Sequence, residues 1–216
     1  MKLKSKAATD SLAEQVYQRL LEKLFKRELG PGDLLNRRAV AAELNVSTGP
    51  VLEAMLRLED EGFLEALPRK GTLVRKVDVQ ALRDQLIVRE ALECQAARMY
   101  AGKLKPLRAE LEELAERLDA SPVGSLESAD LEVCFHRLLV RTAGSAGLLR
   151  EFDRVSRLGL FFNVSALSPL GPAATRSSHT AFLKELFKAT KPEACEQLMR
   201  AHLHAGKESV FYEAGN

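Results

Sequence analysis

The chain has 216 residues, 46% of them hydrophobic and 29% charged, which allows a buried core in one large domain or two small ones. Its net charge of +2 does not indicate a strongly basic polyanion-binding protein. The three cysteines are widely spaced, which argues against a disulfide framework and fits a reducing cytoplasm. No apolar run approaches the roughly 20 residues of a membrane-spanning helix, and no signal peptide is recognisable. We therefore expect a cytoplasmic protein that does not enter a membrane.

Two helices are predicted near the N-terminus. The first begins at Asp10 or Ser11 and ends near Glu28, because leucine and valine side chains recur every four residues and form one apolar stripe. The Gly-Pro-Gly sequence at residues 30–32 stops this helix. Asn36 is then expected to cap a short second helix.

A third helix and a β-hairpin complete the N-terminal region. Ser47 is expected to cap the helix, and Gly62 ends it. Residues 63–67 and 72–77 are β-prone, and residues 68–71 between them have the composition of a turn with a basic tip. Three helices followed by such a hairpin predict a winged helix-turn-helix.

Beyond Asp78 the sequence predicts only helices, six in all, which indicates a helical bundle. The predicted breaks between these helices include residues 121–125, 168–172 and 190–192. Pro192 suits the first turn of the last helix, and Thr190 and Glu193 are expected to form a capping box there.

We therefore predict a mainly α protein with two domains. Residues 1–77 form a winged helix-turn-helix DNA-binding domain of three helices plus a β-hairpin. Residues 78–216 form an all-α bundle of six or seven helices.

The N-terminal domain has candidates for contact with DNA. The third helix of such a domain lies in the major groove, with its N-terminal residues nearest the base edges. The residues expected to contact DNA are Arg37, Arg38, Ser47, Thr48, Gly49, Arg57, Arg69, Lys70 and Gly71. The alternative is that the charged members of this set are solvated surface charges. The order of three helices and a hairpin favours the DNA-binding interpretation.

Several linked segments of this domain carry a family resemblance. They are GPGDLL at residues 30–35, VAAELNVS at 40–47, PVLEAMLRLEDEGF at 50–63 and GTLV at 71–74. Together they resemble the winged-helix signature of the GntR family of bacterial transcription regulators. Thr48 and Leu52 stand where that family usually has arginine, whereas Arg38 matches a family arginine. The resemblance implies binding to double-stranded operator DNA, and the departures imply an unusual operator that depends more on Arg38, Arg57 and the wing.

All four histidines lie in the predicted helical domain. His136, His179 and His202 fall on apolar faces of three different helices, whereas His204 falls on a polar face. Glu132 precedes His136 by four residues, so both project from the same side of their helix. Three imidazoles and one carboxylate can surround a divalent metal ion and leave coordination positions open. The alternative is that each histidine is a core residue with satisfied hydrogen bonds.

Cys134 lies two residues from both Glu132 and His136, so on a helix it points away from them. We interpret its side chain as part of the packing.

A second resemblance covers about residues 80–212. It rests on VREALE at residues 88–93, EVCFH at 132–136, SH at 178–179 and RAHL at 200–203. These segments resemble the FCD sensor domain of FadR-like members of the GntR family. In many members an aspartate at the position of Glu132 and three histidines bind a metal ion. The resemblance thus implies a divalent metal, zinc or nickel, bound by Glu132, His136, His179 and His202.

The same resemblance implies a small-molecule effector and a homodimer. Members of this branch typically bind small carboxylates, and Arg89 matches a recurrent arginine that we expect to contact the effector. The alternative role of Arg89 is a salt bridge to Glu93, four residues further on. We expect the effector to shift the population of conformations that fit the operator.

Two rival functions are compatible with the same candidate residues. In the first, the chain is a metal-dependent enzyme in which Glu132 acts as a base toward a metal-bound water. The sequence disfavours it, because no second acid or base with suitable spacing stands out and an enzyme does not need the N-terminal domain. In the second, the chain is a regulator whose metal is only structural.

Overall fold

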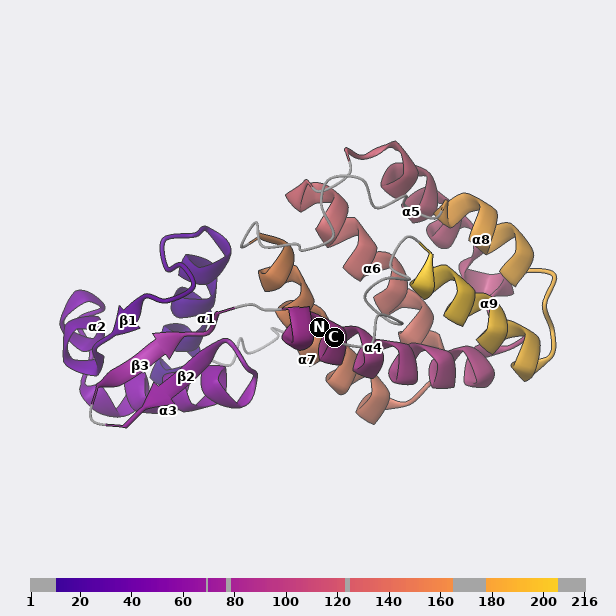
Figure 1. The fold of residues 1–216 in the computed structure, drawn as a ribbon. Coiled ribbons are helices and arrows are strands. Elements are labelled where there is room, and N and C mark those ends of the chain that lie inside the picture. The colour runs from indigo at the N-terminus through magenta and orange to yellow at the C-terminus, as the bar shows by residue number, and fades with distance from the viewer. Residues whose placement is uncertain (1–10, 69, 77–78, 123–124, 165–177, 206–216) are drawn as a thin grey trace, which may run out of the picture. The chain divides into compact units, whose positions relative to one another are not determined.

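The structure of the chain is a computed structural model, which describes residues 11–68, 70–76, 79–122, 125–164 and 178–205 (Figure 1). The chain divides into two compact units, residues 1–76 and residues 77–216.

The first unit is a winged helix-turn-helix. Its elements are α1 (Leu12–Phe25), β1 (Leu34–Leu35), α2 (Arg37–Glu43), α3 (Thr48–Asp60), β2 (Leu64–Leu67) and β3 (Gly71–Val74). The strands form an antiparallel sheet in the order β1-β3-β2. The predicted helices and hairpin are confirmed. The third strand, β1, was not predicted, because two residues are too few to show a period of two.

Local signals in the sequence set most helix ends of this unit. The Ser11 hydroxyl accepts a hydrogen bond from the backbone N–H of Glu14, and the Asn36 side chain accepts one from the backbone N–H of Arg38. Gly62 follows α3 with a φ of +87°, a left-handed conformation that glycine adopts without strain. These three predicted helix ends are confirmed.

Two details differ from the predictions. Helix α1 ends at Phe25 instead of near Glu28, because Arg27 already has a left-handed backbone with a φ of +59°. Ser47 is the N-cap residue of α3 as predicted, but its side chain makes no capping hydrogen bond.

The core of the first unit lies between α1 and α3. Val16, Leu20 and Leu24 of the predicted stripe are buried, but Leu12 at its start is 54% exposed. They pack with the buried face of α3, which consists of Val51, Ala54, Met55 and Leu58.

The second unit contains six α-helices among the residues that the structure describes, as predicted. They are α4 (Val79–Tyr100), α5 (Arg108–Ala120), α6 (Leu126–Thr142), α7 (Ala146–Val164), α8 (His179–Leu186) and α9 (Pro192–His204), with a short 3-10 helix, η1 (Lys105–Leu107), before α5. Helix α4 packs against α6, α7 and α9, and α5 packs against α6 and α8.

Two expectations for this unit were wrong. The predicted capping box of Thr190 and Glu193 does not form, because the N-cap residue of α9 is Lys191 and no side chain caps it. Pro192 does occupy the first turn, as predicted. Cys134 is exposed and not part of the packing, since it lies on the side of α6 that faces away from the core.

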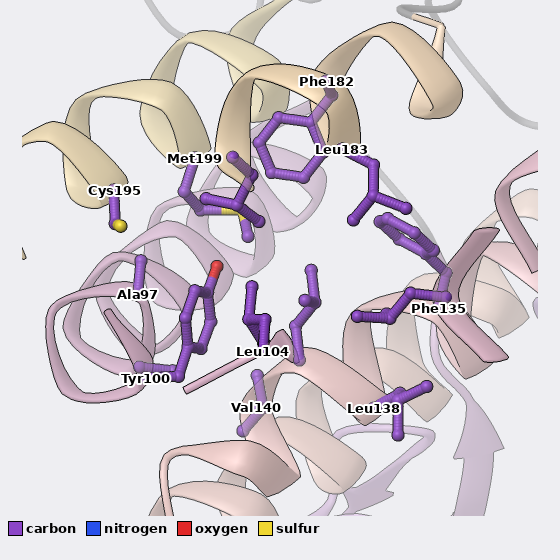
Figure 2. Close-up of a cluster of buried hydrophobic side chains, with 14 of the residues drawn as sticks. Ala97, Tyr100, Leu104, Phe135, Leu138, Val140, Phe182, Leu183, Cys195 and Met199 are labelled. Carbon is purple, nitrogen blue, oxygen red and sulfur yellow. The ribbon is translucent and has the colours of Figure 1, made fainter. Parts of the chain in front are cut away.

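The hydrophobic core of the second unit contains side chains from all six of its described helices. Figure 2 shows Phe135 of α6, Phe182 and Leu183 of α8, Met199 of α9 and Tyr100 of α4 gathered in one cluster. Aromatic rings of this core also touch histidines: the Phe182 ring stacks on His202 with centroids 4.1 Å apart, and Phe135 meets His179 edge-on at 5.1 Å. The core therefore fixes the positions of two of the candidate metal ligands.

Candidate functional site

Three histidines meet inside the helical unit. His136 comes from α6, His179 from α8 and His202 from α9, and all three are buried. Each ring has one nitrogen atom that lies within 4.8 Å of a nitrogen atom of both other rings. The structure thus brings three of the four predicted metal ligands together, although the sequence separates them by 66 residues.

Glu132, the fourth predicted ligand, lies beside two of these rings. Its Oε2 is 2.9 Å from Nε2 of His179, and its Oε1 is 3.4 Å from Nε2 of His136. Burial tends to raise the pKa of Glu132, but the neighbouring histidines and Arg89 outweigh it and hold the pKa well below its usual value. Glu132 is therefore an anionic oxygen donor at this site.

The hydrogen bonding of the rings fits a metal ion. In the described part of the chain, Nε2 of His136 and both ring nitrogens of His179 are buried and make no hydrogen bond of good geometry, although carboxylate oxygens of Glu132 and Asp119 lie 2.9–3.4 Å from them. Buried polar atoms left unsatisfied typically cost about 1–3 kcal/mol each. A divalent ion held by one nitrogen of each imidazole and by one carboxylate would give Nε2 of His136 and one ring nitrogen of His179 a partner, so the residues present fit such a group.

Glu93 is a site residue that sequence reasoning missed. It lies on α4, is fully buried, and its Oε2 is hydrogen-bonded to Nδ1 of His136. Burial tends to raise the pKa of Glu93, but Arg89 and His136 outweigh it and lower that pKa. A carboxylate that accepts a hydrogen bond from Nδ1–H keeps the proton on that nitrogen, so Nε2 of the ring has a lone pair that can bind a metal.

A signal for Glu93 was present in the sequence. Glu93 precedes the buried residues Ala96, Ala97 and Tyr100 by three, four and seven positions, so it lies on the apolar stripe of α4. A carboxylate on an apolar stripe needs a buried partner.

Arg89 lies at the edge of the same cluster. Its Nε donates a hydrogen bond to Glu93, and one of its terminal nitrogens donates to Oε1 of Glu132 at 3.2 Å. The salt bridge to Glu93, which was the alternative role, is thus present, and Arg89 also touches a predicted metal ligand.

Asp119, at the end of α5, positions the helix that carries His179. Its carboxylate accepts hydrogen bonds from the backbone N–H groups of His179 and Thr180 and from the hydroxyls of Ser178 and Thr180, at 2.7–3.1 Å. Burial tends to raise the pKa of Asp119, but these hydrogen bonds lower it to about 2. This role has no local signal in the sequence, because the helix that Asp119 holds begins 60 residues later.

His204 lies outside the cluster, as predicted. Its Nε2 is 2.7 Å from Oε2 of Glu90 on α4.

Most of the predicted DNA-contacting residues are exposed on the first unit. Arg37 and Arg38 lie in the first turn of α2, and Ser47, Thr48 and Gly49 begin α3. In the wing, Lys70 is exposed, and Arg69 lies outside the described residues. Gly71 is exposed and has a φ of +118°, and a Cβ there would come within 3.3 Å of the Leu35 carbonyl oxygen. Glycine at that position is thus required by the turn, whatever its role toward DNA.

Arg57 differs from the other predicted contacts. Its guanidinium lies 3.7 Å above the Tyr17 ring and forms ion pairs with Glu14 at 2.6 Å and Glu61 at 3.2 Å. The contacts with Tyr17 and Glu14 join α3 to α1, so the charge of Arg57 is used within the domain.

Comparison with known proteins identifies both units. The sequence model of the bacterial regulatory proteins of the gntR family matches residues 12–74, and that of the FCD domain matches residues 84–205. The chain belongs to the GntR family. Its relatives include an HTH-type transcriptional regulator from an unstable DNA locus of Streptomyces ambofaciens, 30% identical over 198 residues, or 88% of this chain and 81% of the relative. The HTH-type transcriptional repressor RspR of Escherichia coli is 27% identical over 94% of this chain and 90% of its own length.

Solved structures show the same fold. E. coli McbR/YncC aligns with a TM-score of 0.68 at 24% identity, over 94% of this chain and 98% of that one. A GntR regulator from Rhodococcus sp. RHA1 aligns with a TM-score of 0.69 at 21% identity, over 95% of this chain and all of the other.

This GntR protein is therefore a DNA-binding transcriptional regulator with an FCD domain, and not an enzyme. The rival prediction of a metal-dependent enzyme is set aside. Among the described helices, none is both long and apolar enough to cross a membrane.

Proposed function

We propose that this GntR regulator binds a divalent metal ion through His136, His179, His202 and Glu132, and that a small carboxylate bound beside the metal controls its affinity for operator DNA. The observation that supports this most strongly is the meeting of three buried imidazoles, two of them with unsatisfied nitrogens next to a carboxylate. Three nitrogen donors and one oxygen donor suit zinc or nickel.

Each residue of the cluster has a distinct task in this proposal. The metal, when bound, supplies a positive charge that attracts a carboxylate. Glu93 holds the proton on Nδ1 of His136, and the hydrogen bonds of Asp119 hold the first turn of α8, where His179 lies. Arg89 stays a proposed effector contact, because its hydrogen bonds to described residues use two of its five N–H groups.

On the DNA side, we propose a cytoplasmic homodimer that places two winged helices on a two-fold operator. The proposed contacts are Arg37, Arg38, Ser47, Thr48, Gly49, Arg69, Lys70 and Gly71. Arg57 was predicted among them, but its ion pairs and its position over Tyr17 support a role in joining α1 to α3. Light scattering after gel filtration tests the dimer, which should have twice the mass of the chain.

The test is a DNA-binding titration on an operator selected from random DNA. Metal-loaded and chelator-treated protein are each titrated with a panel of small mono- and dicarboxylates, and the operator Kd is measured by fluorescence anisotropy. The proposal expects at least one carboxylate to change the Kd of the loaded protein by 5-fold or more, and to change that of the chelated protein much less. If no carboxylate changed the operator Kd of the metal-loaded protein, the effector role would be contradicted and the metal would be purely structural.

A further inference from the structure

The exposed side of α3 has an unusual composition for a helix that reads DNA. In its first two turns, all of which the structure describes, the exposed residues are Thr48, Gly49, Leu52 and Glu53. None of these has the paired donors that bind guanine, or the amide that binds adenine. The next cation along the helix, Arg57, is held by Glu14 and Glu61.

Leu52 is not needed for the core of the domain. The buried face of α3 consists of Val51, Ala54, Met55 and Leu58, whereas the Leu52 residue is 38% exposed. Thr48 lies one turn before Leu52, so the two side chains share a face of the helix. Their methyl groups form an apolar strip at the end of α3 that enters the major groove in helix-turn-helix proteins.

We propose that Leu52, together with the methyl group of Thr48, selects thymine by contact with its C5-methyl group. This rests on the proposed placement of α3 in the major groove. The C5-methyl of thymine is the apolar group that base pairs present in that groove, so an apolar side chain can discriminate only through it. The exposed arginines of α2, Arg37 and Arg38, supply charge complementary to phosphates, which favours DNA over an apolar protein partner.

The experiment removes single methyl groups from the DNA. An operator is first selected from a random library with the full-length protein at low salt, and it should contain thymine in each half-site. Each thymine is then replaced by uracil, which lacks only the C5-methyl group, and Kd is measured by fluorescence anisotropy. At one or two positions per half-site the replacement should weaken binding roughly fourfold, the value of one buried methyl group.

Two leucine variants locate the contact. Leu52→Ala should weaken binding to the thymine operator. It should also lose most of the preference for the thymine operator over the uracil operator, and the Thr48 methyl group accounts for what remains. Leu56→Ala is the matched control, because Leu56 is also exposed, at 55%, but lies one turn further from the start of α3. This variant should keep the fourfold preference for thymine. Both sites are on the surface, and circular dichroism checks that both variants remain folded.

Three results would overturn the proposal. They are equal affinity of the wild type for every uracil-substituted operator, an unchanged thymine preference in Leu52→Ala, or loss of that preference in Leu56→Ala. Each leaves the DNA-binding function intact. If the selection instead enriched no sequence, sequence-specific DNA binding itself would be contradicted. The role of Leu52 would then be contradicted as well.

Discussion

The Glu93 carboxylate of α4 is hydrogen-bonded to Nδ1 of His136 on α6, in the interior of the helical domain where both residues are fully buried. This contact fixes which nitrogen of His136 faces the other two histidines. Carboxylates that hold metal-ligating histidines in this way typically contribute 10- to 100-fold to metal affinity.

We therefore predict that Glu93→Gln lowers zinc affinity at least 10-fold while all four proposed ligands remain. The neutral glutamine carbonyl oxygen accepts a weaker hydrogen bond from Nδ1–H of His136 than the charged carboxylate does. The substitution also removes the ion pair with Arg89. Competition with a chromophoric chelator measures the affinity. Glu193→Gln is the control, because the Glu193 side chain is 63% exposed and its ion pair is with Arg98. Equal zinc affinity in wild type and Glu93→Gln would contradict this role.

Asp119→Ala should lower the free energy of unfolding by about 1–2 kcal/mol, as loss of a helix cap does. The substitution leaves two backbone N–H groups at the start of α8 without their acceptor. Urea denaturation followed by circular dichroism measures the change. Asp130→Ala on α6, an exposed aspartate, should change stability by less than about 0.5 kcal/mol. Equal stabilities of the two variants would show that the Asp119 cap contributes little.

Arg57→Met should lower the stability of the protein, whereas Arg38→Met should lower its affinity for DNA. Arg57 contacts Tyr17 and two glutamates, so its loss should destabilise the protein by about 1 kcal/mol with little change in operator affinity. Arg38 is exposed, so its loss should leave the melting temperature unchanged, weaken DNA binding and reduce the slope of log K against log salt by about 1. If Arg57→Met instead lost much operator affinity at unchanged stability, Arg57 would be a DNA contact and not a link between helices.

The sequence predicted those parts of the molecule that depend on short-range periodicity. The winged helix, six helices of the second domain and the burial of His136, His179 and His202 followed from spacing and helix caps. It did not predict β1, which two residues and pairing with β3 define.

The parts that were missed depend on contacts between distant segments. Glu93 meets His136 across 43 residues, and Asp119 caps a helix 60 residues further on. Arg57 looked like a DNA contact, because its partners Tyr17 and Glu14 lie on another helix. Periodicity shows which face a residue occupies, but not which element packs against that face.

The most direct test of the proposed metal site is the metal content of two neighbouring histidine variants. His202→Gln and His204→Gln change the same residue type two positions apart on α9, but only His202 belongs to the cluster. Protein purified without chelator or affinity tag, then dialysed against limiting zinc, is measured by inductively coupled plasma mass spectrometry. The account predicts about one metal ion per chain in the wild type and His204→Gln, and a large loss in His202→Gln. Equal metal content in both variants, or none in the folded wild type, would contradict it.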